Sequence, residues 1–260
     1  MKNGVRVFLA VFIALGLSWC GFVLAPARQL GGAKQTMILN SSDVYPVGRP
    51  GDANQGLQIY RANGCAACHT EQVRQTGVDC DVVLTDIGKK PKAVSIRMAQ
   101  MKLNGLSREA AGAVVDQITG AGGNAEIHIV ATGPDIERGW GKRQSVAEDF
   151  LYDYPVQPGS LRAGPDLSNL GVSKPDLNWQ LVHLYAPSSE VKDSTMPPFR
   201  YLFEVRKING SPSPDALFFP KGFEPSAGYE IIPTPAAKEL AAYLLSLRAN
   251  MPLYDAPFTP

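Results

Sequence analysis

The chain has 260 residues, of which 45% are hydrophobic and 19% charged, and this size predicts one large or two modest globular domains. Its 25 basic and 24 acidic residues nearly cancel, so no basic surface for nucleic acid stands out. Four cysteines are too few for a scaffold built on disulfides, whereas 25 glycines and 21 prolines predict long loops.

The amino end carries a long apolar run. Val7–Ala25 contains no charged residue and approaches the roughly 20 residues that a spanning helix needs. A cleaved signal peptide is the alternative, with Ala25–Ala27 as its cleavage site, although the apolar region of a signal is usually about 7–15 residues long. We therefore predict a transmembrane anchor over 1–27, with Lys2 and Arg6 keeping the amino terminus in the cytoplasm.

A tether and a short helix follow the anchor. Residues 28–50 contain Gly, Ser and Pro without a sustained period, which predicts a tether. The stretch Asp52–Gly64 predicts a helix with Asp52 as its N-cap, Leu57 and Tyr60 on one face, and a stop at Gly64.

Residues 79–132 differ from the loop-rich chain around them. "DVVLTDIG" and "AEIHIVA" predict two strands. Between them, Val94, Met98, Met101 and Leu103 recur at roughly helical spacing, and a second helix begins at Ser107. We predict a β-α-α-β unit inserted over 79–132.

The remaining chain alternates loops and helices. Lys174–Pro187 predicts a helix that Pro187 ends, and Ser194–Phe203 a loop stiffened by two prolines. Ser211–Thr234 holds too much Pro and Gly for regular structure. The chain's last clear element is an amphipathic helix that begins at Pro235.

Cys65, Cys68 and His69 form a Cys-x-x-Cys-His motif, the attachment pattern for c-type haem. The two thiols add to the haem vinyl groups, and the adjacent histidine binds iron. A zinc pair or a redox dithiol is the alternative reading. Zinc needs two further ligands at suitable spacing, and Cys80, His128 and His183 form no recognisable second pair.

The second axial ligand of an electron carrier is Met or His. Met196 lies in "DSTMPPFRY", where two prolines hold the chain extended and present the thioether without helix packing. His183 is the alternative, against its reading as a helix residue packed beside Trp179. Arg74 and Arg162 are candidates to pair with haem propionates, or else face solvent.

Three motifs together resemble class I cytochromes c. Gly56 and Tyr60 precede the haem motif, Gly164–Gly171 matches the family's Gly-Pro-x-Leu loop, and an amphipathic helix follows. The resemblance implies a mainly α fold, over 51–78 and 133–260, in which the last helix crosses the first. It also implies that the Pro165 carbonyl accepts a hydrogen bond from His69 and so controls the basicity of this ligand.

A narrower resemblance rests on "GLQIYRANGCAACHTEQVR", "RAGPDLSNLG", "NWQLVHLYAP" and "STMPPFRYLF" in this order. With the single amino-terminal helix, they resemble the monohaem subunit II of cbb3-type cytochrome c oxidases. The resemblance implies one covalent haem c and electron relay from other c-type cytochromes to a haem–copper catalytic subunit. It also implies a single-pass protein of the bacterial inner membrane with its haem domain on the periplasmic or outer side. We expect no oxygen reduction by this chain, because two protein ligands would leave iron no open position and the sequence has no histidine cluster for copper.

Some questions stay open at this stage. The 79–132 insertion resembles the C-terminal domain of the bacterial ribosomal stalk protein in fold only, with an unrelated small module as the alternative. A haem carrier of a different respiratory or dehydrogenase complex is the second functional hypothesis. An interaction protein, in which the insertion recruits a partner and the haem is structural or sensory, is the third. Cys80 is expected as a free thiol or in an intermolecular bond.

Overall fold

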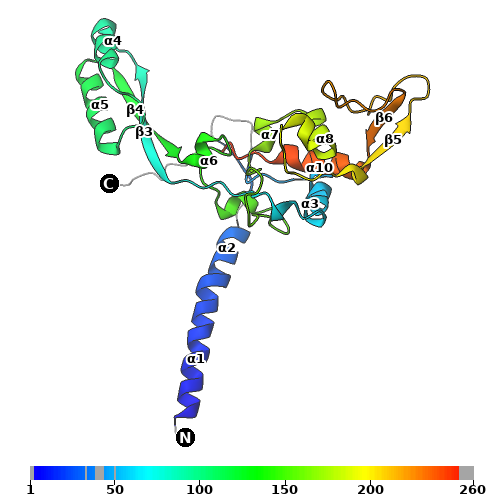
Figure 1. Ribbon diagram of the computed structural model, residues 1–260. Coiled ribbons are helices and arrows are strands. Elements are labelled where there is room, and N and C mark those ends of the chain that lie inside the picture. The colour runs from blue at the N-terminus through cyan, green and yellow to red at the C-terminus, as the bar shows by residue number, and fades with distance from the viewer. Residues whose placement is uncertain (1–2, 33, 39–43, 50, 252–260) are drawn as a thin grey trace. The chain divides into compact units, whose positions relative to one another are not determined.

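The computed structural model describes residues 3–32, 34–38, 44–49 and 51–251 (Figure 1). Lys2, residues 33, 39–43 and 50 of the predicted tether, and residues 252–260 therefore lie outside the described part. The chain divides into two compact units, Met1–Arg49 with Val146–Val156, and Pro50–Ser145 with Gln157–Pro260. The predicted cytochrome region had included 146–156, which the structure instead groups with the amino-terminal segment; the other predicted boundaries stay predictions.

The first unit begins with one continuous helical segment (Figure 1). It comprises α1 (Gly4–Trp19), a π turn (Cys20–Leu24) and α2 (Ala25–Gly31). Among the described residues, this 28-residue segment is the one helix long and apolar enough to span a membrane. The most apolar stretch of this helix is not buried against the rest of the protein. Pro26 explains the π turn, because a proline ring clashes with the carbonyl four residues earlier. The tether prediction from residue 28 was wrong at its start, since α2 continues to Gly31.

The rest of this unit is also structured. Strand β1 (Thr36–Met37) pairs antiparallel with β2 (Val44–Tyr45). The Tyr45 hydroxyl donates to Asp149 Oδ1 at 2.9 Å, beside the short 3-10 helix Ala147–Phe150. Arg49 forms an ion pair with the buried Asp153. These contacts tie 44–49 to 146–156 across a long stretch of sequence.

The core of the second unit is built on α10 (Pro235–Ser246). This helix packs against α3 (Asp52–Ala62), α7 (Leu170–Ser173) and α8 (Leu177–Tyr185), as Figure 1 shows. A Cβ on Gly56 would lie 2.0 Å from the Glu239 carbonyl oxygen, so α3 and α10 approach this closely only because residue 56 has no side chain.

The α3–α10 contact also includes two aromatic rings, those of Tyr60 and Tyr243, whose centroids lie 5.2 Å apart. At the amino end of α3, the N-cap is Gly51. The prediction of Asp52 as the N-cap was therefore wrong by one position, because Asp52 is the first residue of the helix. A carboxylate in the first helical turn still interacts favourably with the helix dipole.

A hairpin follows the short 3-10 helix Arg200–Leu202. Strand β5 (Phe203–Lys207) pairs antiparallel with β6 (Tyr229–Pro233). The prediction of no regular structure over Ser211–Thr234 was therefore wrong at its carboxyl end. The prolines before β6 do not interrupt its ladder, and burial of Ile231 and Ile232 fixes the strand.

The insertion forms a β-α-α-β unit with a core of its own. Strand β3 (Gly77–Asp86) pairs antiparallel with β4 (Asn124–Thr132), and α4 (Pro91–Ala99) and α5 (Arg108–Gly120) lie between them in sequence (Figure 1). Val94, Ala111 and Ile118 are fully buried in this core. The Ser107 hydroxyl caps α5 by accepting from the Ala110 amide.

The predicted helical spacing in the insertion was too long. Met101 and Leu103 follow α4 and lie outside it, although both pack against the same core. The Leu103 carbonyl accepts a 2.7 Å hydrogen bond from the Val82 amide, so this segment lies against the outer edge of β3.

Candidate functional site

The Cys-x-x-Cys-His motif lies directly after α3. Gly64 takes a left-handed conformation, φ 68°, that ends the helix, and Cys65–Ala67 then form one 3-10 turn. The amides of Cys68 and His69 both donate to the Cys65 carbonyl, at 3.1 and 3.0 Å. This single turn holds both cysteines and the histidine within one compact segment, as two-point attachment to one ring requires.

Both cysteines of the motif are free thiols, as are Cys20 and the buried Cys80. Burial raises the pKa of the Cys65 thiol to about 11. A redox dithiol depends on a lowered thiol pKa, so this environment disfavours the dithiol reading. Across the described residues there is no group of three or more His, Cys, Asp and Glu side chains placed to hold a metal ion.

The imidazole of His69 is oriented by a backbone carbonyl. His69 Nδ1 lies 2.8 Å from the Pro165 carbonyl oxygen. A carbonyl only accepts, so Nδ1 carries the proton and Nε2 is left with its lone pair. This is the tautomer that a histidine needs in order to bind a metal through Nε2.

Two glycines let the loop before Pro165 lie against the histidine. A Cβ on Gly164 would lie 2.3 Å from His69 Cε1 and 2.7 Å from His69 Nδ1. A Cβ on Gly159, whose φ is 75°, would lie 2.2 Å from the His69 carbonyl oxygen. The Gly164 amide also donates to the Cys68 carbonyl at 2.9 Å. The whole loop is thus shaped to the motif, with no room for side chains at these two positions.

Met196 lies in an extended loop between the short helix α9 (Pro187–Glu190) and the 3-10 turn before β5. Its half-buried side chain packs against the same core cluster as Cys65 and Ala66. The Met196 amide donates to the Ser194 hydroxyl at 3.3 Å, which helps to set the loop. The structure thus brings Met196 to the core that also contacts the haem motif; its role as ligand remains a prediction.

His183 stacks on Trp179, with ring centroids 4.8 Å apart and planes 7° from parallel, so the expected packing beside Trp179 is confirmed. Burial lowers the pKa of His183 to about 4, and the positive charge of Lys174 lowers it further. Its Nδ1 is buried and has no hydrogen-bond partner among the described residues. His183 is therefore neutral, and its ligand role stays the untested alternative.

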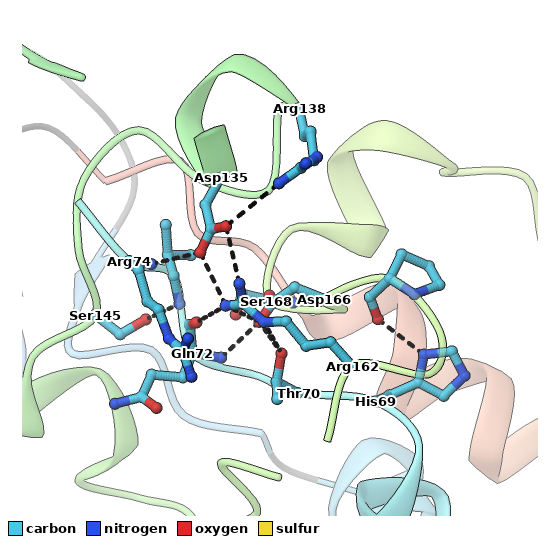
Figure 2. A network of polar contacts seen from close by, with 12 residues as sticks. His69, Thr70, Gln72, Arg74, Asp135, Arg138, Ser145, Arg162, Asp166 and Ser168 are labelled. Carbon is cyan, nitrogen blue, oxygen red and sulfur yellow. Dashed lines mark hydrogen bonds and ion pairs between the residues drawn. The ribbon is translucent and has the colours of Figure 1, made fainter. Parts of the chain in front are cut away.

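The two candidate arginines lie in different surroundings. Arg162 is held within the protein, where its guanidinium donates to Thr70, Gln72 and two carboxylates (Figure 2). The structure thus gives Arg162 partners other than the predicted propionate, because carboxylates of the chain itself take the donors. Arg74 is exposed and contributes its backbone amide to the same network, at 2.8 Å from Asp135 Oδ2.

Asp135 and Asp166 are the site residues that the sequence reading missed. Both carboxyl groups are almost fully buried and both contact Arg162. Each follows a Gly-Pro pair, in "GPDIERG" and "GPDLSNL". The repeated Gly-Pro-Asp tripeptide was the available signal, because a polar residue next to a chain-stiffening proline marks a fixed position.

A comparison with protein families gives one match. Residues 130–215 match the family model described as the cytochrome c oxidase mono-haem subunit, FixO. No curated protein matches the chain. The matched segment contains Pro165, α8 and Met196 but not the Cys65–His69 motif, so the match and the motif are independent observations. The match supports the resemblance to the mono-haem subunit of cbb3-type oxidases, and with it a haem and a part in electron transport.

Proposed function

We propose that this chain is a membrane-anchored monohaem cytochrome c that passes single electrons to the catalytic subunit of a cbb3-type haem–copper oxidase. The observation that carries the proposal is the hydrogen bond from His69 Nδ1 to the Pro165 carbonyl, directly beside the two cysteines of the motif. It frees Nε2 for iron, and it lies beside a segment that matches an oxidase subunit family.

The donor set fits a covalently bound haem c. Cys65 and Cys68 would supply the two thioether bonds, because both are free thiols and each can add across one vinyl group. His69 and Met196 would bind the haem iron. The haem, when bound, supplies the one-electron change between ferric and ferrous iron.

The chain's own residues do three things in this proposal. Pro165 orients His69 and raises its basicity by accepting the Nδ1 proton in a hydrogen bond. The Met196 thioether raises the reduction potential, which suits the oxidising end of a respiratory chain. With both residues bound, iron would have no open position for oxygen, so in this proposal the chain would transfer electrons and would not reduce oxygen itself.

The amino-terminal helix supports the placement of the haem unit in this proposal. A helix of 28 residues spans about 42 Å, more than the roughly 30 Å hydrocarbon core of a membrane. Arg6 before the apolar run favours a cytoplasmic amino end, and this supports the proposal that the haem unit lies on the periplasmic side of a bacterial inner membrane. A signal segment remains the competing reading of the same helix.

The test is co-purification from membranes followed by turnover. A tagged chain should bring down a haem–copper subunit, and the complex should consume oxygen with electrons supplied by a reduced c-type cytochrome. A Cys65→Ser, Cys68→Ser double variant is the control, since it keeps the anchor but has no thiol for attachment. Isolation of the chain in a complex that lacks any haem–copper subunit would support the alternative, a carrier of another respiratory or dehydrogenase complex.

A further inference from the structure

All three guanidinium nitrogens of Arg162 donate hydrogen bonds within the protein (Figure 2). Its Nη1 and Nη2 donate to the two carboxylate oxygens of Asp135, at 2.9 and 2.8 Å. Its Nε donates to Thr70 Oγ1 at 2.9 Å, and Nη2 also donates to the Gln72 carbonyl at 2.7 Å. The guanidinium therefore joins Asp135 directly to the backbone that follows His69.

Asp166 closes the other side of this network. Its side chain is fully buried and accepts from Thr70 Oγ1 at 2.5 Å and from the Gln72 amide at 2.9 Å. Arg162 Nη2 lies 3.4 Å from the same carboxylate. Because Thr70 follows His69 and Asp166 follows Pro165, these bonds clamp the two residues next to the His69–Pro165 hydrogen bond.

Asp135 links the network to the end of the insertion. It lies in α6 (Pro134–Glu137), directly after β4, and also accepts from the Arg74 amide. Burial alone would raise the pKa of Asp135, but hydrogen bonds from Arg162 and from the Arg74 amide outweigh burial, so the pKa lies below its usual value. The carboxylate is therefore charged, and it holds the segment after His69 through its bonds to the Arg74 amide and to Arg162.

We propose that Arg162, with Asp135 and Asp166, is a positioning network that sets the His69–Pro165 hydrogen bond and thereby the reduction potential of the haem. The inference rests on the proposed ligation of haem iron by His69. Arg162 is a positioning residue, because it acts through Thr70, Asp166 and Pro165 and not on the iron.

The positioning role requires the shape of arginine and not only its charge. A guanidinium forms two parallel bonds to one carboxylate, whereas a lysine ammonium is a point charge without this fork. A positioning role and a simple charge effect also predict shifts of the reduction potential in opposite directions when Arg162 is replaced. A weaker bond at His69 Nδ1 makes the imidazole less basic and raises the potential, whereas loss of a positive charge nearby favours ferric iron and lowers it.

The test uses the full, haem-loaded chain with Arg162→Lys, which keeps the charge and removes the fork. We expect its oxidised-to-reduced ratio at a fixed ambient potential to fall about tenfold, equivalent to an upward shift of about 59 mV for a one-electron couple. Exchange of the His69 Nδ1 proton with solvent, followed by NMR of the reduced protein, should accelerate at least about threefold.

Two further variants keep the test decisive. Thr70→Val removes one link without changing any charge, and should shift both readouts in the same direction by a smaller amount; it stands in if Arg162→Lys does not fold. Arg206→Lys is the matched control, because Arg206 pairs with Glu230 in the β5–β6 hairpin. It should leave both readouts at the wild-type value.

The outcomes separate this inference from the proposed function. A low-spin wild-type spectrum with Arg162→Lys and Thr70→Val indistinguishable from Arg206→Lys would overturn the positioning role alone. A downward shift in Arg162→Ala with no change in Arg162→Lys would assign Arg162 a charge effect and overturn it too. A wild-type chain without covalent haem would overturn the proposed function, and the inference with it.

Discussion

The segment around His69 and the inserted unit 77–132 are stabilised in different ways. The loop that carries His69 is held by residues far apart in the chain: the Thr70–Asp166 bond joins positions 96 residues apart, and the Tyr243–Glu71 bond joins positions 172 apart. The insertion instead buries Val94, Ala111 and Ile118 among residues of its own 77–132 stretch. The first arrangement fixes a geometry for chemistry, whereas the second forms a module with its own core.

The largest test of this comparison is removal of the module. Replacing Gly77–Thr132 by two glycines should leave covalent haem and its low-spin spectrum intact, because the residues on either side of the module already lie together. A Cβ added at Gly133 would lie only 2.8 Å from Thr76 Oγ1. A haem-stained gel and an absorption spectrum check this. Loss of haem from the shortened chain, with normal haem in the full chain, would show that the module is needed for the site.

Matched glycine-to-alanine substitutions in the two regions should change stability in opposite directions. Gly56→Ala in α3 should destabilise by about 3 kcal/mol, because its Cβ would meet the α10 backbone at 2.0 Å. Gly112→Ala in α5 should stabilise by about 0.5–1 kcal/mol, because nothing lies within 4 Å and alanine is the better helix former. Denaturant unfolding, followed at the haem band for Gly56 and by hydrogen exchange of α5 for Gly112, measures both. Equal effects would remove the distinction between the regions.

The buried carboxylate of the His69 region gives a pH-dependent prediction. Asp135→Asn should lower the free energy of unfolding by about 2 kcal/mol at pH 7, since a charge-assisted bond is lost. The pKa of Asp135 lies below its usual value, so its stabilisation is complete above the unfolded pKa of about 3.9 and is lost as pH falls through the lower folded pKa. The gap between wild type and variant should therefore close below about pH 4; a gap that widens in acid would contradict this assignment.

The smallest effects should come from the helix caps. Ser107 caps α5 and Thr234 caps α10 by accepting from the Ala110 and Ala237 amides. Alanine at either position should cost about 1 kcal/mol. Only Thr234→Ala should lower the midpoint of unfolding seen at the haem band, since α10 packs on α3; Ser107→Ala should be silent there and visible in hydrogen exchange of the insertion.

The sequence predicted best what depends on local pattern. The helices beginning at Asp52 and Pro235 and the strand–helix–helix–strand order of the insertion follow from periodicity and capping, and the structure has these elements. Strand β6 was missed because its pairing partner, not its own proline-rich surroundings, decides its conformation. Asp135 and Asp166 were missed for a related reason: the repeated Gly-Pro-Asp tripeptide distinguishes the two aspartates, but nothing along the chain shows that both contact Arg162.

In the candidate site, too, the residues of one local motif were predictable, whereas contacts between distant segments were not. Residues within one motif, such as Cys65, Cys68 and His69, are identified by fixed spacing, and Pro165 came from a family resemblance. The orientation of His69, the tautomer of its ring and the close fit of Gly164 needed coordinates. Arg162 shows why: its side chain can reach either a propionate or a carboxylate, and only the folded arrangement places Asp135 within 2.8 Å.

The most direct test of the central claim is the absorption spectrum of the oxidised, haem-loaded chain with Met196→Ala and with His183→Ala. Ligation by His69 and Met196 predicts a far-red methionine–iron band and a low-spin spectrum in the wild type. It predicts loss of the band in Met196→Ala and its retention in His183→Ala. Loss of the low-spin spectrum only in His183→Ala would contradict the account and transfer the second ligand to His183.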